Sequence, residues 1–168
     1  MANRTHSIIA KGVGKTRGIT ARLEGLVGVF RTLAEQHAEV KVLLKKLQDN
    51  PDMRAELWPD IRSELLSHEK GELDEVYSVL RMHAATAELA DHHDEEAGEM
   101  QGLIDEIDSA DSETWQMLFD ELVDTVSFHA TEEEKEIFPK AQKTIGDKVA
   151  KELDARFLAA KKQIANLV

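Results

Sequence analysis

The sequence predicts an all-α fold: an up-down antiparallel four-helix bundle with an N-terminal extension and a short C-terminal helix. Hydrophobic residues recur every three or four positions along almost the whole chain, and no segment shows the alternation typical of a β-strand. The 168 residues include only three prolines and nine glycines, so long uninterrupted helices are expected. The length suits a single domain over residues 16–168, preceded by a flexible lead-in over residues 1–15.

The first predicted helix runs from about Thr16 to Leu47, because its hydrophobic stripe continues until Asn50-Pro51 breaks the pattern. That stripe contains Leu26, Phe30, Leu33, His37, Val40, Leu44 and Leu47. A second helix is expected to begin near Pro51 or Pro59 and to end at a break within Arg81–Thr86. Its stripe contains Ile61, Leu65, His68, Glu72, Val76 and Val79. Both stripes therefore include polar residues where the spacing demands core residues.

The third predicted helix lies between this break and the turn-forming residues 109–112. Its stripe contains Ala90, His93, Ala97, Met100, Ile104 and Ile107. The fourth helix is expected to end near Pro139, and its stripe contains Trp115, Leu118, Leu122, Val126, His129, Glu133 and Ile137. A shorter amphipathic helix is expected after Gly146. Four long helices with short connections pack as a bundle, and the terminal segments are expected to be accessories to it.

Composition narrows the classes of function. Acidic residues outnumber basic residues by 33 to 21, and the resulting net charge of −12 disfavours nucleic acids and anionic membranes as partners. Cysteine is absent, which excludes thiolate catalysis and iron–sulfur clusters, so a bound metal must be held by nitrogen and oxygen atoms. The first residues contain no apolar stretch typical of a signal peptide, and no run has the length of a membrane span. A cytoplasmic location is therefore expected.

Each of the four main stripes contains a histidine, and two stripes contain a glutamate one helical turn later. These pairs are His68 with Glu72 and His129 with Glu133, and the i, i+4 spacing places both members on one face of a helix. An unpaired buried carboxylate destabilises a protein by several kcal/mol, so two of them among hydrophobic residues require a common explanation. A pair of metal ions provides one, and the nitrogen and oxygen ligands suit iron or manganese, with zinc as an alternative.

The two glutamate-bearing stripes share one template. After the histidine come a glutamate at +4, a glutamate at +7, a β-branched residue at +8 and an aromatic residue at +9. The two stretches are His68-Glu-Lys-Gly-Glu72-Leu-Asp-Glu75-Val76-Tyr77 and His129-Ala-Thr-Glu-Glu133-Glu-Lys-Glu136-Ile137-Phe138. The match predicts two helices with equivalent roles about a pseudo-two-fold axis through the metal pair.

With these motifs, the chain resembles the hemerythrin-like (HHE cation-binding) family over about Leu26 to Pro139, the expected metal-binding core at about 26–139. The family carries an isolated His, a His-x-x-x-Glu, a further His and a second His-x-x-x-Glu or Asp. The segment His129–Pro139, with its aromatic-proline ending, is the most similar part. The resemblance implies two iron ions, oxo- or hydroxo-bridged, with manganese or zinc as substitutes. The implied ligands, with Glu72 and Glu133 as bridging candidates, are His37, His68, Glu72, His129 and Glu133.

The ligand from the third helix remains open between two neighbours. A helix points His92 and His93 about 100° apart, so one of the two is expected to face the metals. The more regular stripe favours His93, whereas His92 with Glu96 would form another His-x-x-x-Glu pair. Glu69 is a further open candidate: some members of the family use a carboxylate at this position, but a solvent-facing glutamate is equally expected.

The sequence therefore predicts a non-haem di-iron protein that binds or reacts with dioxygen, hydrogen peroxide or nitric oxide in a small apolar pocket. The candidate pocket walls are Leu33, Val40, Met100, Leu122 and Val126. Oxygen carriers of the family have two histidines one turn apart in the third helix, whereas here Ala97 follows His93 at that spacing, which argues against reversible oxygen carriage. A di-iron oxidoreductase, a sensing or storage module for iron or oxygen without turnover, and a metal-free helical adaptor remain as alternatives. The sequence does not identify a protein partner.

Overall fold

A computed structural model describes residues 2–168, with side chains from Ile8 onward, and the residues that it describes form helices and turns without a β-strand. The elements are α1 (Ala2–Leu23), α2 (Val29–Asp49), the 3₁₀ turn η1 (Pro51–Met53), α3 (Arg54–Glu72), the π-helical turn η2 (Leu73–Tyr77), α4 (Ser78–Leu80), α5 (Ala87–Ser109), α6 (Trp115–Glu132), the π-helical turn η3 (Glu133–Ile137) and α7 (Phe138–Ala165). The all-α prediction is confirmed. None of the described helices is long and apolar enough to cross a membrane.

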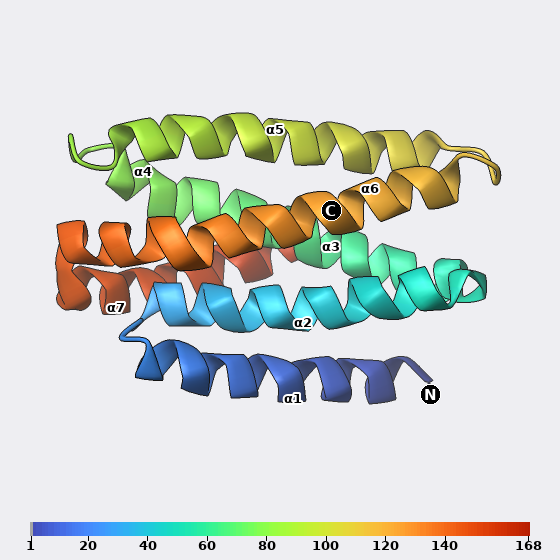
Figure 1. Cartoon of the computed structure of the whole chain (residues 1–168), viewed down its shortest axis with the longest axis horizontal. Coiled ribbons are helices and arrows are strands. Elements are labelled where there is room, and N and C mark those ends of the chain that lie inside the picture. The colour runs from blue at the N-terminus through green and yellow to red at the C-terminus, as the bar shows by residue number, and fades with distance from the viewer. Residues whose placement is uncertain (1) are drawn as a thin grey trace.

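The helices α2, α3, α5 and α6 pack around the core, and α7 adds residues such as Leu153 and Phe157 to it (Figure 1). Helix α2 packs against α3 and α6, and α5 packs against the same two helices. Helix α1 lies along the outside of α2, whereas α7 packs against α3 and α2. Each helix of the core therefore presents one face to the interior.

The N-terminal part differs from the sequence-based expectation. Instead of a lead-in over residues 1–15 and one helix from Thr16 to Leu47, the chain forms α1 and α2, separated by a turn. Gly25 (φ 94°) and Gly28 (φ 55°) provide the left-handed backbone that this turn requires. Helix α1 meets α2 through small residues, and a Cβ atom at Gly18 would overlap the side chain of Glu35. Because this face contains small residues rather than large hydrophobic ones, the hydrophobic spacing of the sequence does not reveal it.

The remaining boundaries are near the expected ones. Helix α3 begins after η1 and contains Pro59, and the chain turns within residues 81–86 as expected. The expected end near Pro139 was wrong, because the helix continues to a kink at Gly146 (φ 82°, ψ 158°). A π-helical turn lies next to each His-x-x-x-Glu stretch: Leu73–Tyr77 begins directly after Glu72, and Glu133–Ile137 begins at Glu133 itself. Such turns are frequent at functional sites.

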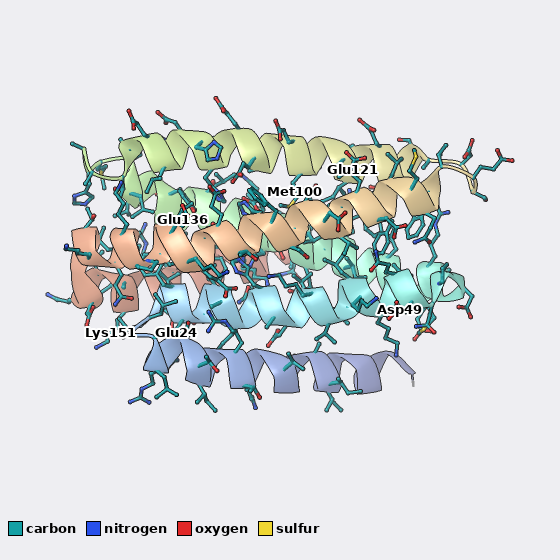
Figure 2. All side chains as sticks on the ribbon, viewed as in Figure 1. Glu24, Asp49, Met100, Glu121, Glu136 and Lys151 are labelled. Atoms are coloured by element: carbon teal, nitrogen blue, oxygen red, sulfur yellow. The ribbon has the colours of Figure 1, made fainter. Side chains whose placement is uncertain are left out.

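The hydrophobic core consists of two clusters with a polar layer between them. One cluster contains Leu33, Val76, Ala90 and Ile137, and the other contains Leu44, Leu65, Met100 and Val126. We call α2, α3 with η2, α5, and α6 with η3 the four helical rods. Along each rod, the histidine of the hydrophobic stripe lies between residues of the two clusters. Figure 2 shows Met100 midway along the bundle, where side chains of several helices extend inward.

Candidate metal centre

Four histidines from four helices form the polar layer. They are His37 on α2, His68 on α3, His93 on α5 and His129 on α6. The rings are arranged as two pairs: the centroids of His37 and His68 are 5.1 Å apart, and those of His93 and His129 are 4.9 Å apart. His93 is fully buried, His37 and His129 are buried, and the side chain of His68 is 13% exposed. Helical periodicity brings all four into the interior, because each occupies a core position of its stripe.

The first group of potential ligands comprises His37, His68 and Glu72, each of which offers an atom within 4.8 Å of the others. The Nε2 atom of His68 is 3.3 Å from Oε2 of Glu72, one helical turn further along α3. Glu72 has no exposed surface. Two imidazole nitrogens and a buried carboxylate therefore converge on one point.

The second group comprises Glu69, His93 and His129. Glu69 Oε1 lies 3.0 Å from Nε2 of His93, and Oε2 lies 3.6 Å from Nε2 of His129. Glu69 is 8% exposed, so this carboxylate faces the interior rather than solvent. The structure thus brings the open candidate Glu69 into the cluster.

Glu133 lies between the two groups. Its Oε2 atom is 3.2 Å from Nε2 of His37 and 3.5 Å from Nε2 of His129. Glu133 and Glu72 also form a group with His93. Glu133 is therefore close to imidazoles of both groups of potential ligands.

The inward-facing polar atoms are buried, and although several lie 3.0–3.5 Å from one another, they make no hydrogen bond of normal geometry. These atoms are Nε2 of His37, His68, His93 and His129, Nδ1 of His93, Oε1 of Glu69, both carboxylate oxygens of Glu72, and Oε2 of Glu133. Buried polar atoms without partners are rare in native proteins, because each costs about 1–3 kcal/mol. Their donor types fit two cations that prefer nitrogen and oxygen ligands, such as iron.

Outward-facing nitrogens have partners. His37 Nδ1 donates to Glu134 Oε1 at 2.9 Å, and His129 Nδ1 donates to Glu96 Oε2 at 2.9 Å. In the neutral imidazole, an acceptor on Nδ1 keeps the proton there and leaves Nε2 free, which is the arrangement of metal-binding histidines.

Two further hydrogen-bonding contacts lie on the outer side of the histidines. His68 Nδ1 donates to Gln36 Oε1 at 3.0 Å. The guanidinium of Arg17 on α1 holds the Glu134 carboxylate, with Nε and Nη2 at 2.9 and 2.7 Å from its Oε2 atom. Helix α1 therefore supports the partner of His37 from outside the core.

The surroundings shift the pKa values of the two central carboxyl groups, Glu72 and Glu133, in opposite directions. Burial and the neighbouring Glu133 raise the pKa of Glu72 well above its usual value. Burial opposes ionisation of Glu133 too, but His129 and His37 hold the pKa of Glu133 well below its usual value. Without bound metal, these surroundings therefore favour the protonated form of Glu72 and the ionised form of Glu133.

The histidines are also unequal. Burial would lower the pKa of His129, but the carboxylates of Glu133 and Glu96 raise it to about 10. His37 likewise has a raised pKa, because Glu133 and Glu134 outweigh its burial. Burial lowers the pKa of His68 well below its usual value. The protonated forms of His129 and His37 are therefore favoured, whereas imidazole binds metal only in its neutral form.

The structure separates the two neighbouring histidines of α5. His93 points into the cluster, whereas His92 is largely exposed and forms an outer group with Glu96 and Glu132. Glu96 contacts the inner site through Nδ1 of His129.

Sequence reasoning missed Gln36, Glu134 and Tyr77. Tyr77 donates its hydroxyl hydrogen to Glu133, and its ring stacks on His93. The shared aromatic residue at +9 of the template was a signal for Tyr77. Adjacency to a predicted ligand was the corresponding signal for Gln36, which precedes His37, and for Glu134, which follows Glu133.

A cavity of about 20 Å³ adjoins the polar layer. It is lined by four inner residues (His37, His68, Glu69 and His129), by Val40, Leu65, Met100, Val126 and Ala130, and by Gln36, Glu64 and Lys161. The predicted walls Val40, Met100 and Val126 line this cavity, whereas the predicted walls Leu33 and Leu122 do not. A cavity of this volume holds about one molecule the size of water.

Comparisons with known proteins agree with this geometry. No curated protein and no solved structure matched the chain. The family model of the hemerythrin HHE cation binding domain matches residues 28–141, a segment that contains every residue of the polar layer. The chain therefore belongs to the hemerythrin HHE cation-binding domain family.

Proposed function

We propose that this chain is a non-haem di-iron protein, built as an up-down four-helix bundle, that binds or reacts with a small molecule such as dioxygen, hydrogen peroxide or nitric oxide. One observation carries the proposal: inward-facing nitrogens and carboxylate oxygens of four rods are buried and unpartnered. Three of the four histidines also have an acceptor on Nδ1 that leaves Nε2 free.

The residues divide between two ion positions. His37, His68 and Glu72 would hold one ion, and Glu69, His93 and His129 would hold the other. Glu133, which is close to His37 and His129, would connect the two positions.

Iron in such a site supplies one-electron redox change and Lewis acidity, which side chains alone do not provide. The protein's own contribution is to orient the imidazoles, to exclude bulk water and to hold Glu133 ionised next to Tyr77. The high share of carboxylates favours the ferric state, which supports redox chemistry or sensing over reversible oxygen carriage.

The cavity beside the site limits the ligand. Its volume of about 20 Å³ restricts the ligand to a molecule of nearly the size of water. Dioxygen, hydrogen peroxide and nitric oxide meet this limit, whereas organic substrates of ordinary size do not.

Metal analysis with optical spectroscopy tests the proposal. The full chain, loaded anaerobically with ferrous salt and then oxidised, should contain two irons and show a ligand-to-iron charge-transfer band. Glu133→Ala should lose iron, whereas Glu136→Ala, an exposed glutamate of the same template, should retain it. If the chain contained no metal after loading, the proposal would be contradicted, and the metal-free helical adaptor would be the alternative that fits.

A second measurement separates enzyme from sensor. Rapid gas evolution from added peroxide, lost in Glu133→Ala and retained in Glu136→Ala, would identify catalase-like turnover. Stable binding of two irons without consumption of peroxide or nitric oxide would indicate sensing or storage.

A further inference from the structure

A hydrogen-bond chain connects the C-terminal part of α7 to His68. Lys161 Nζ donates to Gln36 Oε1 at 2.6 Å and to Glu64 Oε2 at 2.7 Å. The same oxygen of Gln36 accepts the hydrogen of His68 Nδ1 at 3.0 Å. Lys161 lies beyond the family segment 28–141, so a residue outside that segment influences a proposed metal ligand.

The outer partner of His68 differs in kind from the others. His37 and His129 face the carboxylates of Glu134 and Glu96, which accept hydrogen bonds but cannot donate them when ionised. A carboxylate therefore fixes the proton on Nδ1 without further help. The Gln36 amide has an accepting end and a donating end, so by itself it is compatible with either tautomer of a neutral imidazole.

Lys161 removes this ambiguity. An ammonium group has three donors and no acceptor, so it requires the oxygen of the amide rather than the NH₂ group. With the oxygen turned toward Lys161, the same oxygen faces His68 Nδ1. If the amide turned around, its NH₂ group would face Nδ1, and the proton would move to Nε2, the atom 3.3 Å from Glu72.

Helix packing holds Lys161 in place. The ring of Phe157 meets His68 edge-on at 5.8 Å between centroids. A Cβ atom at Gly71 would lie 3.3 Å from the Phe157 ring and 3.5 Å from the backbone nitrogen of Lys161. The absence of a side chain at Gly71 thus allows α7 to approach α3 at the level of His68.

We propose that Lys161 is a positioning residue that orients the Gln36 amide and thereby holds His68 in the tautomer whose Nε2 is free to bind metal. The consequence for metal binding rests on the proposed function. The tautomer itself is a property of the chain with or without metal.

Histidine ¹⁵N NMR of the full-length, metal-free chain tests the first part. His68 should carry its proton on Nδ1 in the unaltered protein and in Lys161→Arg, and should shift toward the Nε2–H tautomer in Lys161→Met. Gln36→Glu should restore the Nδ1–H tautomer in the Lys161→Met background, because a carboxylate only accepts. Arg156→Met removes a surface ion pair of the same helix to Glu75 and should change nothing.

Titration with Co²⁺ tests the second part. Lys161→Met should weaken one of two binding steps by about 10- to 100-fold, the usual effect of losing an outer partner, and the added Gln36→Glu should recover most of it. An Nδ1–H tautomer in Lys161→Met would overturn the inference, and Lys161→Leu provides a second substitution if the first folds poorly. If the unaltered chain binds no Co²⁺, the proposed function fails, while the NMR result still decides the role of Lys161.

Discussion

The Tyr77 hydroxyl donates a hydrogen bond to Oε1 of Glu133 at 2.7 Å, although the two residues are 56 positions apart in the chain. Tyr77 occupies the +9 position of the first template, and Phe138 occupies the same position of the second. Each ring stacks on a histidine, Tyr77 on His93 and Phe138 on His37. The two halves therefore share their packing but differ in one hydroxyl, and this hydroxyl supports the carboxylate that stays ionised.

Replacing Tyr77 tests this support. Tyr77→Phe keeps the ring stacked on His93 and removes only the hydrogen bond to Glu133. The metal-free protein should lose about 1.5–3 kcal/mol of unfolding free energy, as for a hydrogen bond to a charged group. Urea denaturation measures the loss, and an unchanged midpoint with an unchanged slope would contradict the assigned contact.

Removing the carboxyl group of Glu72 should make the metal-free protein more stable and should weaken metal binding. Both oxygens of Glu72 are buried without a partner, so Glu72→Met should raise the unfolding free energy of the metal-free chain by about 1–3 kcal/mol. The same variant should bind fewer metal ions. Glu99→Met, at an exposed position of α5, is the control and should leave both quantities unchanged. A less stable metal-free Glu72→Met protein would refute this reasoning.

The metal-free protein should become less stable as pH rises from about 6.5 to about 10. The pKa of His129 is about 10 in the folded chain, above its usual value of 6.5, so the folded state binds this proton more tightly than the unfolded state. The resulting stabilisation is complete below pH 6.5 and is lost as pH rises through 10. Denaturant titrations at several pH values measure the slope, which should be smaller in His129→Gln.

Metal binding should release protons. At neutral pH the metal-free chain keeps a proton on His129, and that proton must leave before Nε2 can bind a cation. Apparent affinity should therefore increase with pH up to about 10. Calorimetry of Co²⁺ binding in buffers of different ionisation enthalpy gives the number of protons, and a value of zero would show that His129 is not a ligand.

In the turn between α1 and α2, substitution by alanine should destabilise the protein more at Gly28 than at Gly25. Gly28 has φ 55°, and a Cβ atom there would overlap the backbone carbonyl of Ala150 on α7. Gly25 has φ 94°, but nothing lies within 4 Å of the corresponding Cβ position. Gly25→Ala should therefore destabilise by about 1–2 kcal/mol from backbone strain alone. Gly28→Ala should destabilise by about 3 kcal/mol or more, because overpacking adds to the strain. Equal losses in thermal denaturation would contradict this packing.

Much of the candidate site could be predicted because helical periodicity is a local property. The positions of His37, His68, His93 and His129 in their stripes follow from spacing along one helix, and so do the i, i+4 pairs with Glu72 and Glu133. Residues that act across helices could not be found in this way. Tyr77, Gln36 and Lys161 reach the site through contacts between segments that are distant in sequence.

Hydrophobic spacing within the chain was sufficient to determine the all-helical class and the inward direction of the histidines, because the amphipathic stripe of a helix is written in consecutive residues. Tertiary packing alone decided that α1 forms a separate helix against α2, since its contact face consists of small residues without a hydrophobic signal. Packing also decided that Glu69 faces His93 and His129, because the exposure of a residue at the edge of a stripe depends on the neighbouring helix.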